Sequence, residues 1–251
     1  MVFSGIVETT GNVKSVKIIK DEFESGVTLE IEPGAEGFMD DDVYLGCSIA
    51  VNGTCLTVTS FSPTSFTVDL APETLRRTSF GNVRVSDKVN LEKALKMNDR
   101  NSGHTVQGHV DGVGVITSMK PDGSSTHVTI STVNLGHTPE ERRYLQSLIV
   151  PKGFIAVDGA SLTICEVDRA KSFFTLMLIP HTQEVLKPWS VDQKVNLELD
   201  CLAKYVSATM RCMVEPVIAN VESRISRSEI LSVCATLLCA CCIYVSCRNL
   251  K

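Results

Sequence analysis

Short runs in which apolar and polar residues alternate cover most of this chain, and a period of two residues is typical of β-strands. The clearest runs lie at residues 48–51, 55–59, 65–70, 154–157, 162–164 and 174–178. An Asn52-Gly53 pair separates the first two runs, and Asp158-Gly159 occupies the equivalent place later in the chain. Both pairs favour tight hairpin turns. Short strands joined by turns, about six per hundred residues, favour a small closed barrel over an α/β sheet.

Helical patterns are fewer. Thr138 is a good N-cap residue, Pro139 suits the first helical position, and two acidic residues follow in the first turn. These signals predict a short amphipathic helix over residues 138–149. A second helix is expected over residues 202–213, after the last strand.

The chain also repeats itself. Residues 50–57 read AVNGTCLT and residues 156–163 read AVDGASLT. Three more blocks recur in the same order: GIVE at 5–8 with GHVD at 108–111, PET at 72–74 with PHT at 180–182, and VNLE at both 89–92 and 195–198. An offset of about 105 residues is the size of a domain. We therefore expect two copies of one domain, at residues 1–104 and 105–206, followed by a helical tail at 207–251.

The differences between the copies are as informative as the matches. Positions with the same residue in both copies are expected to serve the fold. The chemistry changes at three aligned pairs, which are Cys55 with Ser161, Ile6 with His109, and Asp69 with Met177. The sequence therefore predicts two related but unequal sites.

Charge and the start of the chain exclude some classes of function. The formal net charge is −5, and no cluster of lysine and arginine exceeds two adjacent residues. Nucleic-acid binding needs a basic stripe, so no nucleic-acid partner is expected. The repeat begins within the first few residues, so we expect neither a secretory nor a transit peptide.

Ten cysteines are present, and six of them lie beyond residue 210. The four in the repeats have neither CxxC spacing nor a histidine at metal-ligand spacing; they are Cys47, Cys55, Cys165 and Cys201. We expect free, mostly buried thiols in a reducing cytoplasm, and no bound metal.

The repeat pattern ends near residue 206. Residues 230–247 form an uncharged run of 18 residues, which is near the lower limit of length for a membrane-spanning helix. Serine, threonine, alanine and cysteine make the run only weakly hydrophobic. Three interpretations stay open: a membrane anchor, a packed or loosely ordered helix, which is favoured, and a tail that is not native to the mature protein.

His109 is the sharpest single candidate for chemistry. It lies in the segment GHTVQGHVDG at residues 103–112, five residues after His104. On an extended segment two such histidines point to opposite faces, so that one can face a cavity while the other packs between domains. A purely structural histidine is the alternative.

Two polar pairs occupy the same strand position in the two copies. Cys55 with Thr57, and Ser161 with Thr163, are two residues apart and therefore share a strand face. Such a pair forms hydrogen bonds to a ligand if that face lines the mouth of a barrel. The alternative is that small residues fill a tight core.

Three further polar residues stand close to strands. Thr74 and Thr182 follow a strand in the two copies, each within a Pro-x-Thr block. Lys152 precedes a strand in the second copy only, where residues 45–47 of the first copy read LGC. A cation in one copy suits an anionic or carbonyl-rich ligand, although a solvated lysine is the commoner case.

Taken together, the blocks resemble the riboflavin synthase family of the alpha-chain type, which is built from two lumazine-binding repeats. Residues 2–8 are similar to the family's MFTGIVE start, and residues 50–58 to its VNGVCLTV block. Residues 103–112 resemble GHFVQGHVDG, residues 154–163 resemble SIAIDGISLTV, and residues 196–206 resemble NIEVDLIAKYV. The resemblance covers residues 1–206.

The resemblance implies an all-β fold of two tandem six-stranded Greek-key barrels with a C-terminal helix, assembled as a homotrimer. It also implies a transferase whose substrate is 6,7-dimethyl-8-ribityllumazine. One lumazine donates four carbons to another, which gives riboflavin and 5-amino-6-(ribitylamino)uracil. Neither a metal nor an organic cofactor is needed. An association with lumazine synthase is raised by the resemblance and left open.

The resemblance also implies the site, because in this family the N-terminal barrel of one subunit faces the C-terminal barrel of a neighbour. Carried over by motif, the first pocket comprises Gly5, Ile6, Val7, Ser48, Cys55, Leu56, Thr57, Asp69, Leu70, Ala71, Pro72, Glu73 and Thr74. The second pocket comprises Gly108, His109, Val110, Lys152, Ser161, Leu162, Thr163, Met177, Leu178, Ile179, Pro180, His181 and Thr182. The residues expected to act in catalysis, with their individual duties left open, are Cys55, His109, Ser161, Thr163 and Asp200.

The chain departs from the family pattern after Thr182, where QEVLKPW replaces the usual Thr-Thr-Leu-Gly turn. The resulting connection at 183–194 is shorter than its counterpart and affects the rim of the second pocket. A competing hypothesis is a non-catalytic antenna protein that binds lumazine or flavin. Such proteins lose polar residues from the second site. The enzyme is favoured because this chain keeps His109, Lys152, Ser161, Thr163 and Thr182.

Overall fold

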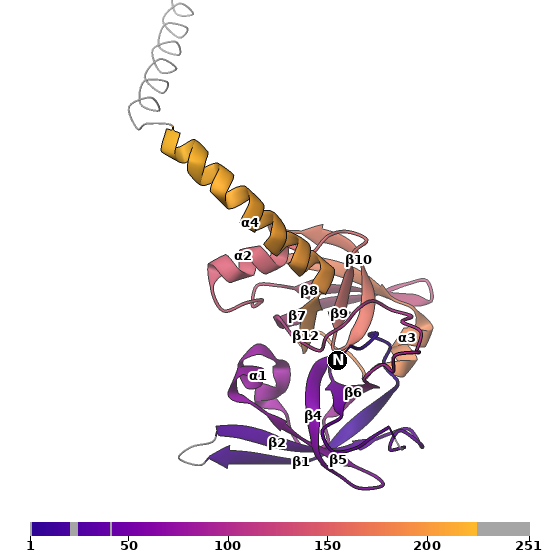
Figure 1. The fold of residues 1–251 in the computed structure, drawn as a ribbon. Coiled ribbons are helices and arrows are strands. Elements are labelled where there is room, and N and C mark those ends of the chain that lie inside the picture. The colour runs from indigo at the N-terminus through magenta and orange to yellow at the C-terminus, as the bar shows by residue number, and fades with distance from the viewer. Residues whose placement is uncertain (1, 21–24, 41, 225–251) are drawn as a thin grey trace, which may run out of the picture. The chain divides into compact units, whose positions relative to one another are not determined.

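Two closed, six-stranded antiparallel barrels follow one another in the computed structural model, which describes residues 2–20, 25–40 and 42–224 (Figure 1). The first barrel consists of β1 (Thr9–Lys20), β2 (Ser25–Pro33), β3 (Ser48–Val51), β4 (Thr54–Phe61), β5 (Phe66–Leu70) and β6 (Lys88–Lys93). The second consists of β7 (Gly112–Asp122), β8 (Ser125–Ser131), β9 (Phe154–Val157), β10 (Ala160–Asp168), β11 (Phe173–Leu178) and β12 (Lys194–Leu199). The expected all-β architecture is therefore confirmed.

The two barrels share one strand order. Neighbours run β1-β2-β5-β4-β3-β6 around the first ring and β7-β8-β11-β10-β9-β12 around the second. The order β2-β5-β4-β3 is a Greek key, because three hairpin-linked strands lie beside the strand that precedes them. Register shifts also recur, in β1 and β4 of the first copy and in β7 and β10 of the second. The duplication therefore extends to the bulges that bend each barrel.

The expected helices are present, and three short ones were not predicted. The helix α2 (Pro139–Ser147) begins after Thr138, whose hydroxyl accepts a hydrogen bond from the backbone N–H of Glu141 at 3.1 Å. The helix α4 (Cys201–Arg224) extends beyond the predicted 202–213. The unpredicted ones are α1 (Pro72–Arg77), the 3₁₀ turn η1 (Ser79–Asn82) and α3 (Pro180–Val185). Segments of four to six residues are too short to display a helical period.

Residues 1–204 belong to one compact unit, and a second unit begins at Tyr205, within α4. The uncharged run at 230–247 lies outside the described residues. Within residues 2–20, 25–40 and 42–224, no helix is long and apolar enough to cross a membrane.

Each barrel closes over its own hydrophobic core. Phe66 and Phe174 occupy aligned positions in β5 and β11, and both are completely buried. A smaller apolar cluster joins the barrels and consists of Phe3, Ala50, Val106 and Ala156. The expectation of mostly buried thiols is wrong, because only one described cysteine is buried; Cys55 and Cys165 lie on strands, where alternate residues face outwards. Cys47 is buried, Cys55, Cys165 and Cys201 are half-buried, and Cys212 is exposed; all five carry free thiols.

The two hairpin turns predicted from the sequence pack against each other. Asn52 and Asp158 adopt φ of 45°, and Gly53 and Gly159 also have positive φ. A Cβ atom on Gly53 would lie 2.5 Å from the backbone nitrogen of Gly159. The glycines thus serve both the turn and the close approach of the barrels.

Buried asparagines bridge the same junction symmetrically. The Asn90 side chain donates to the carbonyl of Asp158, and the Asn196 side chain donates to the carbonyl of Asn52, both at 2.9 Å. The backbone N–H groups of Asn90 and Asn196 donate at 2.8 Å to the side chains of Asn52 and Asp158. The repeated VNLE block therefore holds the two barrels together.

Lys187 breaks this symmetry. Its Nζ lies 2.9 Å from Oδ2 of Asp158, and both residues are buried. The first copy has the neutral Asn52 where the second has Asp158, so only the second copy needs a cation. The unusual connection at 183–194 thus supplies the counter-ion for a buried carboxylate at the junction.

We expect Lys187→Met to destabilise the fold by about 3 kcal/mol, because it leaves the buried Asp158 carboxylate without a counter-ion. Adding Asp158→Asn copies the first repeat and should bring the double variant to within about 1 kcal/mol of the parent. Urea unfolding at one fixed protein concentration measures both changes. A double variant no more stable than Lys187→Met would contradict this view of the junction.

Candidate functional site

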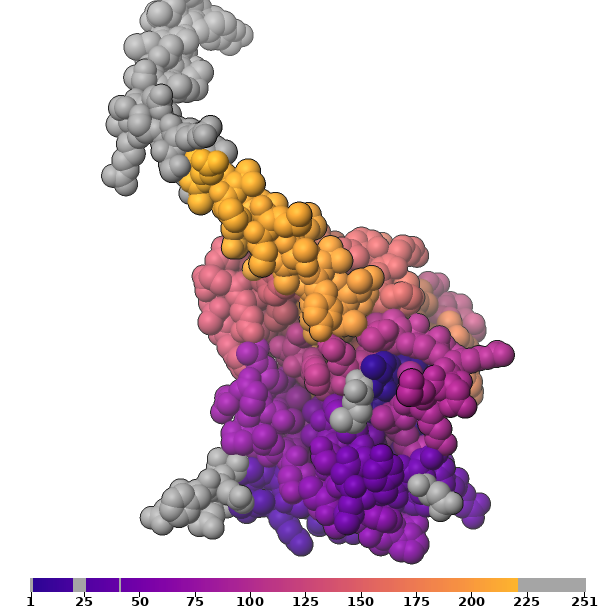
Figure 2. All heavy atoms as spheres, in the orientation of Figure 1, coloured from indigo at the N-terminus to yellow at the C-terminus, as the bar shows by residue number. Residues whose placement is uncertain are grey.

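Residues 2–8 and 103–111 are the leading segments, which precede the first strand of each barrel. They lie side by side at the seam, where the two barrels meet. Phe3 and Val106 exchange both backbone hydrogen bonds, at 2.7 and 3.1 Å. His104 donates its backbone N–H to the carbonyl of Ser4 at 3.1 Å. In Figure 2 the dark blue leading residues of the first copy lie among the magenta residues of the second copy's leading segment. The two repeats therefore meet where each chain segment enters its barrel.

Each leading segment docks on the opposite barrel. The Ser161 N–H donates to the carbonyl of Gly5 at 2.7 Å, and the Cys55 N–H donates to the carbonyl of Gly108 at 2.9 Å. A Cβ atom on Gly5 would lie 2.6 Å from Cβ of Ser161, and one on Gly108 would clash with Cys55. Both glycines also have positive φ. These two positions therefore require glycine.

The two segments dock differently from the grouping expected from the sequence, and ligand binding by these residues stays a prediction. Gly5 was grouped with Cys55, and Gly108 with Ser161. The structure places Gly5 against Ser161 and Gly108 against Cys55. The reason is that each segment crosses the seam before it enters its own first strand.

Two buried glutamates hold these segments. The Glu92 carboxylate accepts hydrogen bonds from the Ser4 N–H at 2.6 Å, the Ser4 hydroxyl at 2.8 Å and the Gly5 N–H at 3.1 Å. Glu198 accepts from the backbone N–H groups of Gln107 and Gly108, at 2.8 and 2.9 Å. Burial raises the pKa of Glu92 to about 7, and burial also raises the pKa of Glu198.

Sequence reasoning missed both glutamates. They end the VNLE block, which is identical in the two copies and was interpreted as serving the fold. An acidic residue at the same place in two matched strands was the available signal.

The first barrel presents polar groups along β3 and β4. Ser48 pairs with Thr57, and Ala50 pairs with Cys55. Thr57 is exposed, whereas Ser48 is buried and its hydroxyl has no hydrogen-bond partner among the described residues. A cavity of about 1040 Å³ adjoins this site, and its lining includes Ile6, Ser48, Cys47, Tyr44, Glu92 and Lys93.

The remaining residues of the first predicted pocket lie at the end of β5 and in the first turn of α1. Asp69 is exposed and accepts a hydrogen bond from the Thr28 hydroxyl at 2.6 Å. Ala71, Pro72 and Glu73 are exposed, and Thr74 is half-buried. Polar and small side chains are therefore accessible where β5 ends and α1 begins.

Five residues expected to bind ligand have side chains packed in the barrel cores. They are Val7, Leu56, Leu70, Leu162 and Leu178. For the four leucines the period of two explains this burial, because neighbours of an outward-facing strand residue point inwards. Whether any of the five residues contacts a ligand stays a prediction.

His104, rather than His109, contacts the polar pair of the second barrel. Its Nδ1 lies 2.6 Å from Oγ of Ser161, and its ring stacks on Phe154 with centroids 5.1 Å apart. Burial lowers the pKa of His104. His109 is exposed. The motif contained both histidines, but the sequence did not show which one faces Ser161.

The other residues of the second pocket form its rim. Thr163 is exposed and pairs with Phe154. Val110, Met177 and Thr182 are half-buried, whereas Ile179, Pro180 and His181 are exposed. Lys152 is exposed and has φ of 65°, whereas the first copy has Gly46 with φ of 84°. A lysine in this left-handed conformation is uncommon, and its role in ligand binding stays a prediction.

Asp200 has a structural contact as well as an electrostatic one. Its Oδ1 accepts a hydrogen bond from the Leu202 N–H at 3.0 Å at the start of α4. Its negative charge also raises the pKa of His104, which opposes the larger effect of burial. The role of Asp200 in catalysis stays a prediction, and its contact with His104 is electrostatic.

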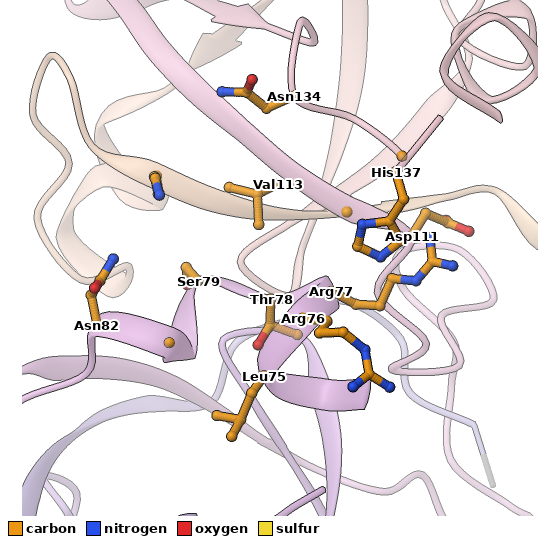
Figure 3. Close-up of a pocket in the computed structure, with 14 residues that line it drawn as sticks. Leu75, Arg76, Arg77, Thr78, Ser79, Asn82, Asp111, Val113, Asn134 and His137 are labelled. Atoms are coloured by element: carbon orange, nitrogen blue, oxygen red, sulfur yellow. The ribbon is translucent and has the colours of Figure 1, made fainter. Parts of the chain in front are cut away.

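A separate polar groove lies between the barrels, beside α1 and η1 (Figure 3). Its volume is about 310 Å³. Arg76, Asn82, Asn134 and His137 are among the side chains around it, and none of the residues expected at either site lines it. Across residues 2–20, 25–40 and 42–224, no group of three or more His, Cys, Asp and Glu side chains is arranged to hold a metal ion.

Comparison with known proteins assigns the class. The family profile of the lumazine binding domain matches residues 4–94 and again residues 107–200. Riboflavin synthase of Schizosaccharomyces pombe is 42% identical over 205 residues, which cover 81% of this chain and 91% of that protein. Riboflavin synthase of Saccharomyces cerevisiae is 37% identical, over 89% of this chain and 92% of that protein. The chain belongs to the riboflavin synthase family, with two lumazine-binding domains in tandem.

Solved structures agree with the fold. LumP in complex with 6,7-dimethyl-8-(1'-D-ribityl) lumazine has a TM-score of 0.63 and 22% sequence identity to this chain. The match covers 78% of this chain and 98% of LumP. At that sequence identity the similarity supports the architecture of the barrels alone.

We expect Asp200→Asn to lower the pKa of His104 further, because it removes the negative charge that favours the imidazolium. Asparagine also caps helices well, so α4 should keep its start. An NMR titration of the His104 ring in both proteins measures the change. An unchanged or higher pKa would show that Asp200 does not act on His104.

Proposed function

We propose that this chain is a riboflavin synthase, a transferase that converts two molecules of 6,7-dimethyl-8-ribityllumazine into riboflavin and 5-amino-6-(ribitylamino)uracil. The main support is the pair of matched barrels with unequal polar groups, Cys55 in one and Ser161 with His104 in the other. A reaction between two copies of one substrate needs two similar pockets with different duties. We place the protein in the cytoplasm, where its free thiols stay reduced.

The second site offers a group that exchanges protons. The lowered pKa of His104 leaves its imidazole neutral near pH 7, so it can accept a proton. Ser161 lies at hydrogen-bond distance and extends that path towards the barrel surface. The reaction requires removal of a proton from the 7-methyl group of one lumazine and activation of C7 of the other. We propose that the His104–Ser161 pair and Cys55 steer these proton transfers, while proximity of the two bound rings supplies most of the acceleration.

Incubation of the purified full chain with 6,7-dimethyl-8-ribityllumazine tests the proposal. Riboflavin absorbance should appear, with two lumazines consumed for each riboflavin formed. Cys55→Ala should lower the rate by about tenfold or more if the thiol takes part in proton transfer. Lumazine binding without turnover would instead favour the non-catalytic antenna hypothesis.

We further propose a homotrimer held together by α4. Between Tyr205 and Arg224, the exposed residues Val206, Met210, Met213 and Val217 recur at intervals of four, three and four. Such intervals place them on one face of a helix, and Arg211 and Glu215 fall on the opposite face. An exposed apolar stripe of this kind is typical of helices that pair with other helices.

A glutamate on the apolar stripe should weaken the trimer, whereas one on the opposite face should not. Met210→Glu introduces a charge into the proposed interface, and Ala208→Glu adds the same side chain on the other face. Size-exclusion chromatography with light scattering distinguishes the outcomes. We expect Met210→Glu to be largely monomeric and Ala208→Glu to remain trimeric. Trimers in both variants would exclude the stripe as the contact.

A further inference from the structure

We propose that Glu92 and Glu198 are positioning residues that act across the seam between the barrels. Glu92 belongs to the first barrel and positions Ser161 of the second. Glu198 belongs to the second barrel and positions Cys55 of the first. Their effect on turnover rests on the proposed function, whereas their effect on the backbone does not.

Glu92 reaches Ser161 through a single glycine. Its carboxylate binds the Gly5 N–H, and the Gly5 carbonyl accepts the Ser161 N–H at 2.7 Å. Gly5 has φ of 75°, and a residue without a side chain moves readily between backbone conformations. The Ser4 hydroxyl, which donates to Glu92, also accepts the Ile6 N–H at 3.2 Å. The peptide planes on both sides of Gly5 are therefore held, which fixes the direction of its carbonyl. The carbonyl in turn fixes the backbone of Ser161, whose side-chain hydroxyl contacts His104.

Glu198 repeats the arrangement with the barrels exchanged. It binds the N–H groups of Gln107 and Gly108, and the Gly108 carbonyl accepts the Cys55 N–H at 2.9 Å. Gly108 has φ of 76°, close to that of Gly5. The same glutamate–glycine arrangement therefore contacts two chemically different residues, Ser161 and Cys55.

Only an ionised carboxylate suits this contact. Every group that binds Glu92 donates a hydrogen, so both carboxylate oxygens must accept. A glutamine or a protonated glutamate presents a donor on one side and loses an acceptor there. Each glutamine variant therefore imitates the protonated residue at every pH.

The two carboxylates have different electrostatic surroundings. Glu92 faces Glu8, whose charge raises its pKa, and the adjacent Lys93 forms ion pairs with Glu8 and Asp40. The cavity beside it is also lined by Asp42, Lys96, Asp99 and Arg100. Glu198 faces Lys204, which lowers its pKa, and Asp111, which raises it. Because the pKa of Glu92 lies at about 7, its hold on Gly5 should weaken as the pH falls through neutrality.

Hydrogen exchange of the backbone tests the crossed action without reference to activity. The variants are Glu92→Gln and Glu198→Gln in the full chain, and Glu32→Gln is a control that removes an exposed carboxylate from a surface ion pair. We expect Glu92→Gln to speed exchange in peptides that contain Ser161 and not in those that contain Cys55. Glu198→Gln should do the reverse, and the control should change neither.

Turnover of 6,7-dimethyl-8-ribityllumazine tests the consequence for catalysis. We expect kcat to fall by about tenfold in either glutamine variant, since small displacements of reacting groups are costly. The parent's kcat should decrease on the acid side with a midpoint near pH 7, towards the value of Glu92→Gln. Glu92→Gln should lack the limb near pH 7 and keep only the loss of kcat at lower pH that protonation of His104 causes. A glutamate with a merely structural role would leave the limb near pH 7 in place.

Several results would overturn the inference. Equal acceleration of exchange at Ser161 and Cys55 in both variants would indicate general destabilisation, and no acceleration would show that the glutamates do not hold the backbone. A limb with its midpoint near pH 7 that is retained in Glu92→Gln would assign that limb to another group. A parent protein that produces no riboflavin would refute the proposed function, while the exchange pattern would still decide the crossed positioning.

Discussion

The structure depends above all on two backbone hydrogen bonds, from Ser161 to Gly5 and from Cys55 to Gly108. Each joins the leading segment of one repeat to a strand of the other repeat, β10 for Ser161 and β4 for Cys55. Neither barrel by itself contains the full surroundings of its own site. The two repeats therefore form one structural unit, although their cores are separate.

The seam combines a symmetric frame with asymmetric chemistry. The paired glycine turns, the bridging asparagines and the buried glutamates are repeated in both copies. The side chains that this frame presents differ, with Cys55 on one side and Ser161 with His104 on the other. Lys187 shows that the frame has also diverged, since it balances a carboxylate that the first copy lacks. Duplication thus preserved geometry, while substitution made the two sites unequal.

The sequence predicted the features that short-range patterns encode. Alternation and the two Gly-containing turns indicated the strands, and Thr138 marked the start of α2. The repeat indicated two barrels because a matched strand order follows from matched blocks. Candidate residues such as Cys55 and Ser161 were found because they differ at an aligned position, and their role in binding or catalysis stays a prediction.

Contacts between segments about a hundred residues apart were beyond reach of those patterns. Nothing in the spacing of Gly5 or Gly108 shows that each docks on the opposite barrel. His104 was overlooked in favour of His109, because alternation shows that two residues face opposite ways and not which way each one faces. Glu92 and Glu198 were overlooked because identity between the copies was taken to indicate a structural role alone.

A crystal structure of the protein with riboflavin bound tests the central claim, that each chain presents two unequal ligand sites built across the seam. One flavin should lie against Cys55, Thr57 and Gly108, and another against Ser161, Thr163 and Gly5. A flavin in the groove beside Arg76 and Asn134, with both barrel surfaces empty, would contradict the assignment of the sites.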